Sequence, residues 1–113
     1  MKSSIPKPVK VINECVALQI QKSHDYQNPQ SRIKQIDYYP RGVLSIMEMI
    51  HTKTTRMWSV LEAAENSAGQ PNFESLEDSA KDLINYASFF VTYLRKEFDG
   101  QDKTKDIFNK WIQ

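Results

Sequence analysis

The chain has 113 residues, which is the size of a single domain with an apolar core of its own. Hydrophobic residues make up 40% and charged residues 26%, so the composition excludes a chain that is disordered throughout. Fifteen basic and fourteen acidic side chains leave a net charge of +1, which excludes a general attraction to nucleic acid or to an anionic membrane.

The cysteine content and the apolar runs indicate the cellular compartment. Cys15 is the single cysteine, so no intrachain disulfide is possible, and the apolar helical pattern around it predicts a buried thiol. No apolar run approaches the ~20 residues of a membrane span. The N-terminus MKSSIPKPVK lacks the apolar stretch of a signal peptide. We therefore expect a cytoplasmic protein without membrane contact.

The first half of the chain predicts two helices. A flexible lead-in at residues 1–8 with two prolines precedes a helix over residues 9–26, which Pro29 ends. A polar connection follows. Residues 43–68 then carry the clearest helical pattern, with apolar side chains at alternating steps of four and three. The predicted inward stripe of this second helix is Val43, Met47, Ile50, Thr54, Met57, Leu61 and Ala64.

The second half predicts a third long helix over residues 75–98. Ser75 begins a variant of the capping box, and Gly100 is the stop signal. A short fourth helix is predicted over residues 103–112. The fold class is therefore all-α, an antiparallel bundle of about four helices in one domain over residues 9–113. The predicted inward stripe of the third helix is Leu76, Ala80, Leu83, Ala87, Phe90 and Leu94.

Four large apolar residues fall outside these stripes. They have two interpretations, which the sequence leaves open: they fill a wider core, or they mark a dimer surface. The residues are Trp58, Phe89, Tyr93 and Phe98.

The third helix carries the most informative polar pattern. Asp78 and Asp82 are four residues apart and share a face, which Asn85 and Tyr86 continue by the next turn. Two carboxylates one turn apart repel each other unless a cation lies between them, and Mg²⁺ prefers such oxygen ligands. A solvated helix face is the other interpretation. Asp82 is the stronger candidate, because a charge in the middle of an apolar helix needs a partner.

Possible partners stand on the other helices. Lys53 and Arg56, one turn apart, are placed to grip a phosphate or to pair with the aspartates, while Glu48 on an adjoining face is a candidate metal ligand. At the end of the first helix, Tyr26 is suited to stacking on a base, and Asp25 to hydrogen bonding. Each of these residues also fits an ordinary surface position.

Taken together, these segments resemble a known family. The chain is similar to the nucleotide modification associated domain, type 1, in three segments that occur in order: HDY at 24–26, IHTKTTR at 50–56 and ESLEDSAKDLINY at 74–86. The resemblance covers about residues 14–95. It implies an all-helical domain of phage nucleotide or modified-DNA metabolism in the host cytoplasm. The implied nucleotide-binding residues are Asp25, Tyr26, Lys53, Arg56, Asn85 and Tyr86, with Asp78 and Asp82 as further motif positions.

A more distant resemblance is to the MazG-like all-α nucleoside triphosphate pyrophosphohydrolases. Those enzymes hold Mg²⁺ with an E-x-x-E pair on one helix and an E-x-x-D pair on the next. Here His51 stands three residues after Glu48, and Ser79 three residues before Asp82, so at least two of the four carboxylates are missing. This resemblance implies Mg²⁺ as cofactor, held by Asp78, Asp82 and Glu48.

Three functional hypotheses follow, and whether the protein is an enzyme stays open. The first is a nucleotide-handling domain, either a Mg²⁺-dependent pyrophosphohydrolase or a nucleotide-binding protein. The second is a non-catalytic helical protein that binds a host protein or a signalling nucleotide. The third is a structural adaptor in which Asp82 pairs with Lys53 or Arg56. Under all three we expect a homodimer or a larger homo-oligomer.

Overall fold

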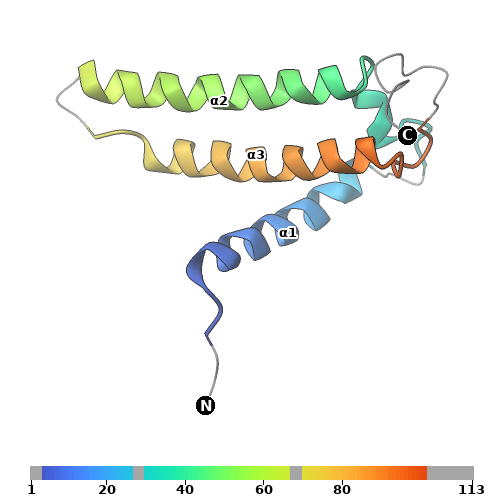
Figure 1. Ribbon diagram of the computed structural model, residues 1–113, viewed down its shortest axis with the longest axis horizontal. Coiled ribbons are helices and arrows are strands. Elements are labelled where there is room, and N and C mark those ends of the chain that lie inside the picture. Colours follow the sequence, from blue (N-terminus) through green and yellow to red (C-terminus); the bar gives the residue numbers. More distant parts are fainter. Residues whose placement is uncertain (1–3, 27–29, 67–69, 102–113) are drawn as a thin grey trace.

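Figure 1 shows the computed structural model of the chain, which describes residues 4–26, 30–66 and 70–101. The described residues contain no strand, so the predicted all-α fold is confirmed. The predicted fourth helix, over residues 103–112, lies outside these ranges, and the number of four helices stays a prediction. The elements in the described ranges are α1 (Lys7–Tyr26), a short 3-10 helix η1 (Gln35–Tyr38), α2 (Val43–Asn66) and α3 (Phe73–Leu94).

The two ends of α3 differ from the prediction. The helix begins two residues early because Asn72, not Ser75, is its N-cap: the Asn72 side chain accepts a hydrogen bond of 3.0 Å from the backbone N–H of Ser75. The helix ends at Leu94 rather than near residue 98. Lys96 there adopts a left-handed backbone with φ +61°, and its N–H donates to the Tyr93 carbonyl. The ending is a Schellman motif whose usual glycine is a lysine.

The start of α1 also differs, since the helix begins at Lys7 rather than at Val9. The N–H groups of Val9 and Lys10 donate to the Pro6 carbonyl at 2.9 and 3.1 Å. Pro8 lies in the first turn, where its missing N–H has no helical partner to lose. The two prolines therefore start the helix, although the sequence interpretation assigned them to a flexible lead-in.

A hairpin of α2 and α3 forms the body of the molecule, with the two helices antiparallel and side by side (Figure 1). Its core lies where α2 begins and α3 ends, around the fully buried Ile46. Phe89 and Tyr93 are buried there, and the ring of Phe98 packs against both, with centroids 6.2 and 6.3 Å away. Three of the four unassigned aromatic residues thus belong to the core, whereas the fourth, Trp58, is 69% exposed.

The helix faces that meet in the hairpin are turned relative to the predicted stripes. On α2, Met47, Thr54 and Leu61 are exposed, while Ile46 and Lys53 point inward. On α3 none of the six predicted inward residues is buried, and the buried residues are Ser79, Asn85, Phe89 and Tyr93. The buried residues differ from the predicted stripe because α3 packs against two helices, α2 and α1. The surface of α3 that these helices cover includes polar side chains.

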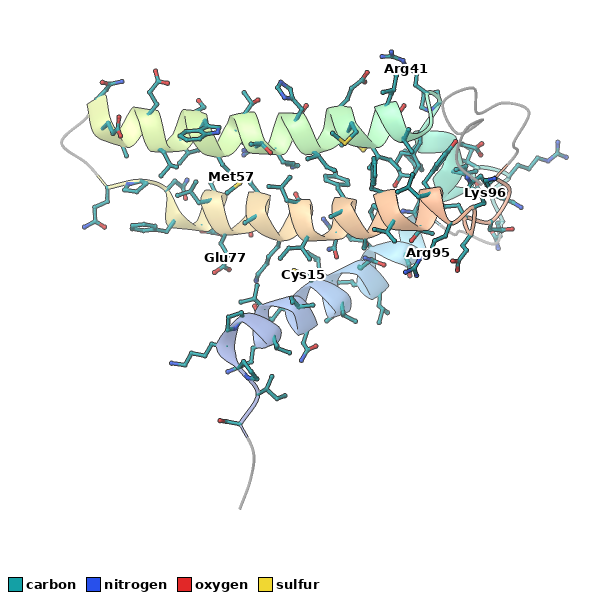
Figure 2. The ribbon with its side chains drawn as sticks, in the orientation of Figure 1. Cys15, Arg41, Met57, Glu77, Arg95 and Lys96 are labelled. Carbon is teal, nitrogen blue, oxygen red and sulfur yellow. The ribbon has the colours of Figure 1, made fainter. Side chains whose placement is uncertain are left out.

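The helix α1 lies against α3 through one side only and diverges from the hairpin toward its N-terminus (Figure 1). Residues 4–14 are all exposed. Cys15 is the most deeply buried of the described residues of α1, with 1% of its surface exposed (Figure 2). Its thiol is directed at the Lys81 carbonyl of α3, 3.9 Å away. The predicted buried thiol is therefore confirmed. Across the described stretches, no helix has the length and apolar character that crossing a membrane requires.

Candidate functional site

Asp82 is the centre of the polar residues between the helices. Its Oδ2 lies 3.0 Å from the Lys53 ammonium of α2, and its Oδ1 lies 3.7 Å from the Lys22 ammonium of α1. The Asp82 and Lys53 side chains are only 22% and 23% exposed. A half-buried carboxylate needs such cationic partners, as the sequence pattern predicted. Asp82 thereby connects all three helices.

A groove between α2 and α3 opens beside this ion pair. Its volume is about 360 Å³. It contains the predicted basic pair, Lys53 and Arg56, together with the predicted acidic pair, Asp78 and Asp82. The sequence therefore identified four residues that the fold does bring to one site. The complete lining is Lys53, Arg56, Asn72, Glu74, Ser75, Asp78, Ser79 and Asp82.

A smaller cleft of about 110 Å³ lies on the other side of Asp82, where α1 approaches α3. Asn85 is buried there, and the Gln19 side-chain amide donates to its Oδ1 at 3.1 Å. Tyr86 and Phe89 provide an aromatic wall. Two amides beside an aromatic surface can recognise the edge and the face of a heterocyclic ring. The complete lining is Gln19, Lys22, Ser23, Gln35, Asp82, Asn85, Tyr86 and Phe89.

A third hollow, of about 430 Å³, adjoins both. It shares Lys53 with the groove and Tyr86 with the cleft, and it holds Glu48. The Glu48 carboxylate is bonded to the Arg41 guanidinium, and both side chains are more than half exposed. Glu48 therefore lines a different hollow from Asp78 and Asp82.

The carboxylates present a limited set of metal ligands. Within residues 4–26, 30–66 and 70–101, no three acidic, histidine or cysteine side chains gather as a metal centre requires. Asp78 and Asp82 do line one groove, and Mg²⁺ commonly binds through one or two carboxylates plus the phosphates of its ligand. The arrangement therefore fits a metal that arrives with a phosphate ligand better than one held by the protein alone.

Two residues that the sequence predicted as nucleotide contacts cannot be placed in the site, and two residues that it did not predict line the cleft. Asp25 and Tyr26 belong to the last turn of α1, but their side chains lie outside the described part of the molecule. Gln19 and Gln35 line the cleft without having been predicted. Gln19 had a sequence signal, because it interrupts the apolar run of α1 between Leu18 and Ile20.

On the flank of the site, Lys81 joins α1 to α3. Its ammonium lies 2.9 Å from Glu14 and 3.2 Å from Glu77. The hydrogen bonds that the Lys81 ammonium donates to these two carboxylates raise the pKa of Lys81. Burial raises the pKa of the neighbouring Cys15 thiol, against a smaller opposite effect of the Lys81 charge. These contacts hold the second half of α1 in the position that closes the cleft.

Comparison with models of known protein families finds no match, and comparison with curated proteins and with solved structures finds none either. The resemblance to the nucleotide modification associated domain therefore stays a prediction that is supported by the sequence segments alone.

Proposed function

We propose that the protein is a nucleotide-handling domain that binds its ligand across Asp82, with the phosphates in the groove and the base in the cleft. The observation that carries this proposal is the shared wall: Asp82 lines both the groove that contains Lys53 and Arg56 and the amide-lined cleft. Lys53 and Arg56 are the phosphate contacts. Asn85 and Tyr86, with Gln19, face the base.

Charge balance favours a metal–nucleotide complex as the ligand. The groove holds two cationic side chains, Lys53 and Arg56, against three acidic ones, Glu74, Asp78 and Asp82. A free polyphosphate would meet a net negative site. Mg²⁺ supplies positive charge that neutralises the phosphates, and Asp78 and Asp82 are the residues that would hold it. Lys53 would then exchange Asp82 for a phosphate oxygen.

The test is direct. Protein, Mg²⁺ and a panel of ribo- and deoxynucleoside triphosphates are incubated, with binding followed by calorimetry and products by chromatography. Monophosphate and pyrophosphate formed by the parent protein would show a pyrophosphohydrolase. Binding without turnover would show a nucleotide-binding protein. If no nucleotide is bound or consumed, the proposal is wrong.

Site variants assign the residues. We expect Asp82→Ala to lose Mg²⁺-dependent nucleotide binding while the helical circular dichroism spectrum is retained. Glu62→Gln on α2 removes an exposed acidic charge outside the groove and is the matched control. Equal affinity in Asp82→Ala and the parent would contradict the site assignment.

A second candidate function, binding of a host protein without catalysis, is favoured by the exposed side of α1. Val9, Ile12, Val16 and Ile20 recur at helical spacing and are 40 to 60% exposed. Such a stripe suits insertion into an apolar groove. Affinity for a partner that Val16→Asp abolishes and Lys53→Ala preserves would support this function over nucleotide binding.

The third hypothesis, a structural adaptor, is favoured by the ion pair of Lys53 and Asp82 itself. Under this hypothesis neither Mg²⁺ nor any nucleotide raises the melting temperature. For the protein as a whole we further propose a cytoplasmic location, in keeping with its single cysteine, and self-association as a homodimer or larger homo-oligomer.

A further inference from the structure

The most buried part of the cleft between α1 and α3 consists of one polar and one aromatic residue. Asn85 and Phe89 are each 8% exposed, whereas the other residues that line the cleft are half-buried or exposed. We call Asn85 and Phe89 the floor of the cleft. A ring that enters the cleft therefore meets one amide and one apolar ring at its leading edge.

Three hydrogen bonds fix which side-chain atom of Asn85 is left for a ligand. The Ser88 hydroxyl donates its one proton to the Asn85 backbone carbonyl at 2.7 Å, so its oxygen can only accept, and Gln19 Nε2 donates to it at 3.0 Å. The same Nε2 group donates to Asn85 Oδ1 at 3.1 Å. The oxygen of the Asn85 amide is therefore engaged within the protein, and its Nδ2 group faces elsewhere.

The Nδ2 group of Asn85 is a buried donor that donates to no described residue. Buried polar groups nearly always have a partner, and leaving one without a partner is costly, so a ligand in the cleft is expected to bring an acceptor. An asparagine with both side-chain atoms free pairs with donors and acceptors alike. Asn85 presents a donor alone, because Gln19 uses its oxygen.

A second amide extends this pattern toward the mouth of the cleft. Gln35 Nε2 donates to the Tyr39 hydroxyl at 3.0 Å, which leaves the Gln35 Oε1 as an acceptor with no described donor. Gln35 is less buried than Asn85 and so lies nearer to solvent. The cleft therefore offers a donor at its floor and an acceptor closer to its opening.

We propose that the cleft selects bases that carry a carbonyl oxygen at C4 of a pyrimidine or C6 of a purine, over the corresponding amino bases. The inference rests on the proposed function, in which the base enters the cleft and the phosphates lie in the groove. These ring positions lie opposite the bond to the sugar, so their substituents reach the floor. A carbonyl there accepts from Asn85, and the ring N–H beside it donates to Gln35. An amino group there would set its N–H groups against those of Asn85.

The first test compares nucleotides that differ in this one group. Calorimetry with Mg²⁺ measures the dissociation constants of uridine against cytidine and of inosine against adenosine, in ribo and deoxy forms. Each is used as the α,β-imido triphosphate, which a pyrophosphohydrolase cannot split. The oxo member should bind at least ~10-fold tighter than the amino member. The two pairs also show whether the cleft takes a pyrimidine or a purine.

A second test reverses the chemistry at the floor. Asn85→Asp keeps the shape of the side chain and an acceptor for Gln19, but it turns an acceptor toward the cleft in place of the donor. The added charge affects both members of a pair alike, so the ratio of their affinities is the readout, and the amino member should become the tighter ligand. Asn13→Asp makes the same chemical change on an exposed residue of α1 outside the cleft and should leave the preference unchanged.

The outcomes separate this inference from the proposed function. Equal affinity within a pair that binds, or tighter binding of the amino member by the parent protein, would overturn the inference and leave the proposed function standing. A preference for the oxo member that persists in Asn85→Asp, with the helical circular dichroism spectrum retained, would also overturn it. If none of these nucleotides binds, the proposed function is wrong and the inference is wrong with it.

Discussion

Lys53 of α2 and Asp82 of α3 form an ion pair of 3.0 Å at the point where the groove, the cleft and the third hollow meet. The pair joins α2 to α3. It also holds the ammonium group that the proposed phosphate contact requires. Fold stability and the proposed ligand binding would therefore depend on the same two side chains.

Removing one member of this pair should destabilise the hairpin. Among the described residues, Lys53→Met leaves Asp82 with the more distant Lys22 as its one cationic partner, and we expect a loss of about 1 to 2 kcal/mol in the free energy of unfolding by urea. The double variant Lys53→Met/Asp82→Leu should lose less than the sum of the single variants. Arg41→Met is the control, because its ion pair with Glu48 is mostly exposed and should contribute less than about 0.5 kcal/mol. Additive single effects would show that the pair is not coupled.

The end of α3 offers a stabilising substitution. Lys96 has φ +61°, a conformation that costs a residue with a side chain about 1 kcal/mol relative to glycine. Lys96→Gly should therefore raise the free energy of unfolding by about 0.5 to 1 kcal/mol in urea titration. Arg95→Gly is the control, because Arg95 has φ −78° and gains nothing from glycine. Stabilisation by both variants, or by neither, would contradict the assignment of strain to Lys96.

The sequence predicted the helices well because helical spacing, prolines and glycines are local signals. It predicted the end of α3 less well. The sequence favours Gly100 as the residue that stops the helix, whereas the chain leaves the helix at Lys96. Gly100 does have a positive φ, +79°, but it serves a later turn that packs on Lys34. Nothing in the type of residue at Lys96 indicates a left-handed backbone.

The direction in which each helix faces could not be derived from apolar spacing. The sequence favours Thr54 as an inward residue, whereas the structure turns Lys53 inward to meet Asp82. Ser79 and Asn85 are buried for the same reason, namely that contacts between helices here include polar groups.

The residues of the candidate site were nonetheless predictable in part, because an isolated charge such as Asp82 in an apolar helix demands a partner. The position of Gln19 within an apolar run was also a signal, but its partner Asn85 could not be predicted, because it is 66 residues away.

The start of α3 gives a prediction that separates the observed cap from the one expected from sequence. Asn72→Ala removes the side-chain acceptor of the Ser75 N–H and should cost about 1 kcal/mol in the free energy of unfolding. Ser75→Ala should cost less than half as much, because Ser75 lies inside the first turn. Thermal unfolding followed by circular dichroism measures both. The reverse order would indicate that the helix starts at Ser75.

The contact of α1 with α3 should weaken at alkaline pH. The pKa of Cys15 is raised by burial, so the folded state favours the protonated thiol, and this contribution is complete below the unfolded pKa of about 8.5. The pKa of Lys81 is raised by its hydrogen bonds with Glu14 and Glu77, so its contribution is complete below about pH 10.4. Both contributions are lost as the pH rises through the folded pKa values. The free energy of unfolding should therefore be flat to about pH 8 and then fall.

Two variants identify the groups responsible for this fall. Cys15→Ala should remove the part that begins between about pH 8 and 8.5, and Lys81→Met should remove part of the loss above about pH 10. Lys10→Met is the control for Lys81→Met, because Lys10 forms no salt bridge with any described residue. Hydrogen exchange of the α1 amides, measured at pH 7 and pH 10 and corrected for the intrinsic pH dependence, locates the effect. Protection lost equally in all three helices would show global unfolding rather than release of α1, and would contradict a specific role for Cys15 and Lys81.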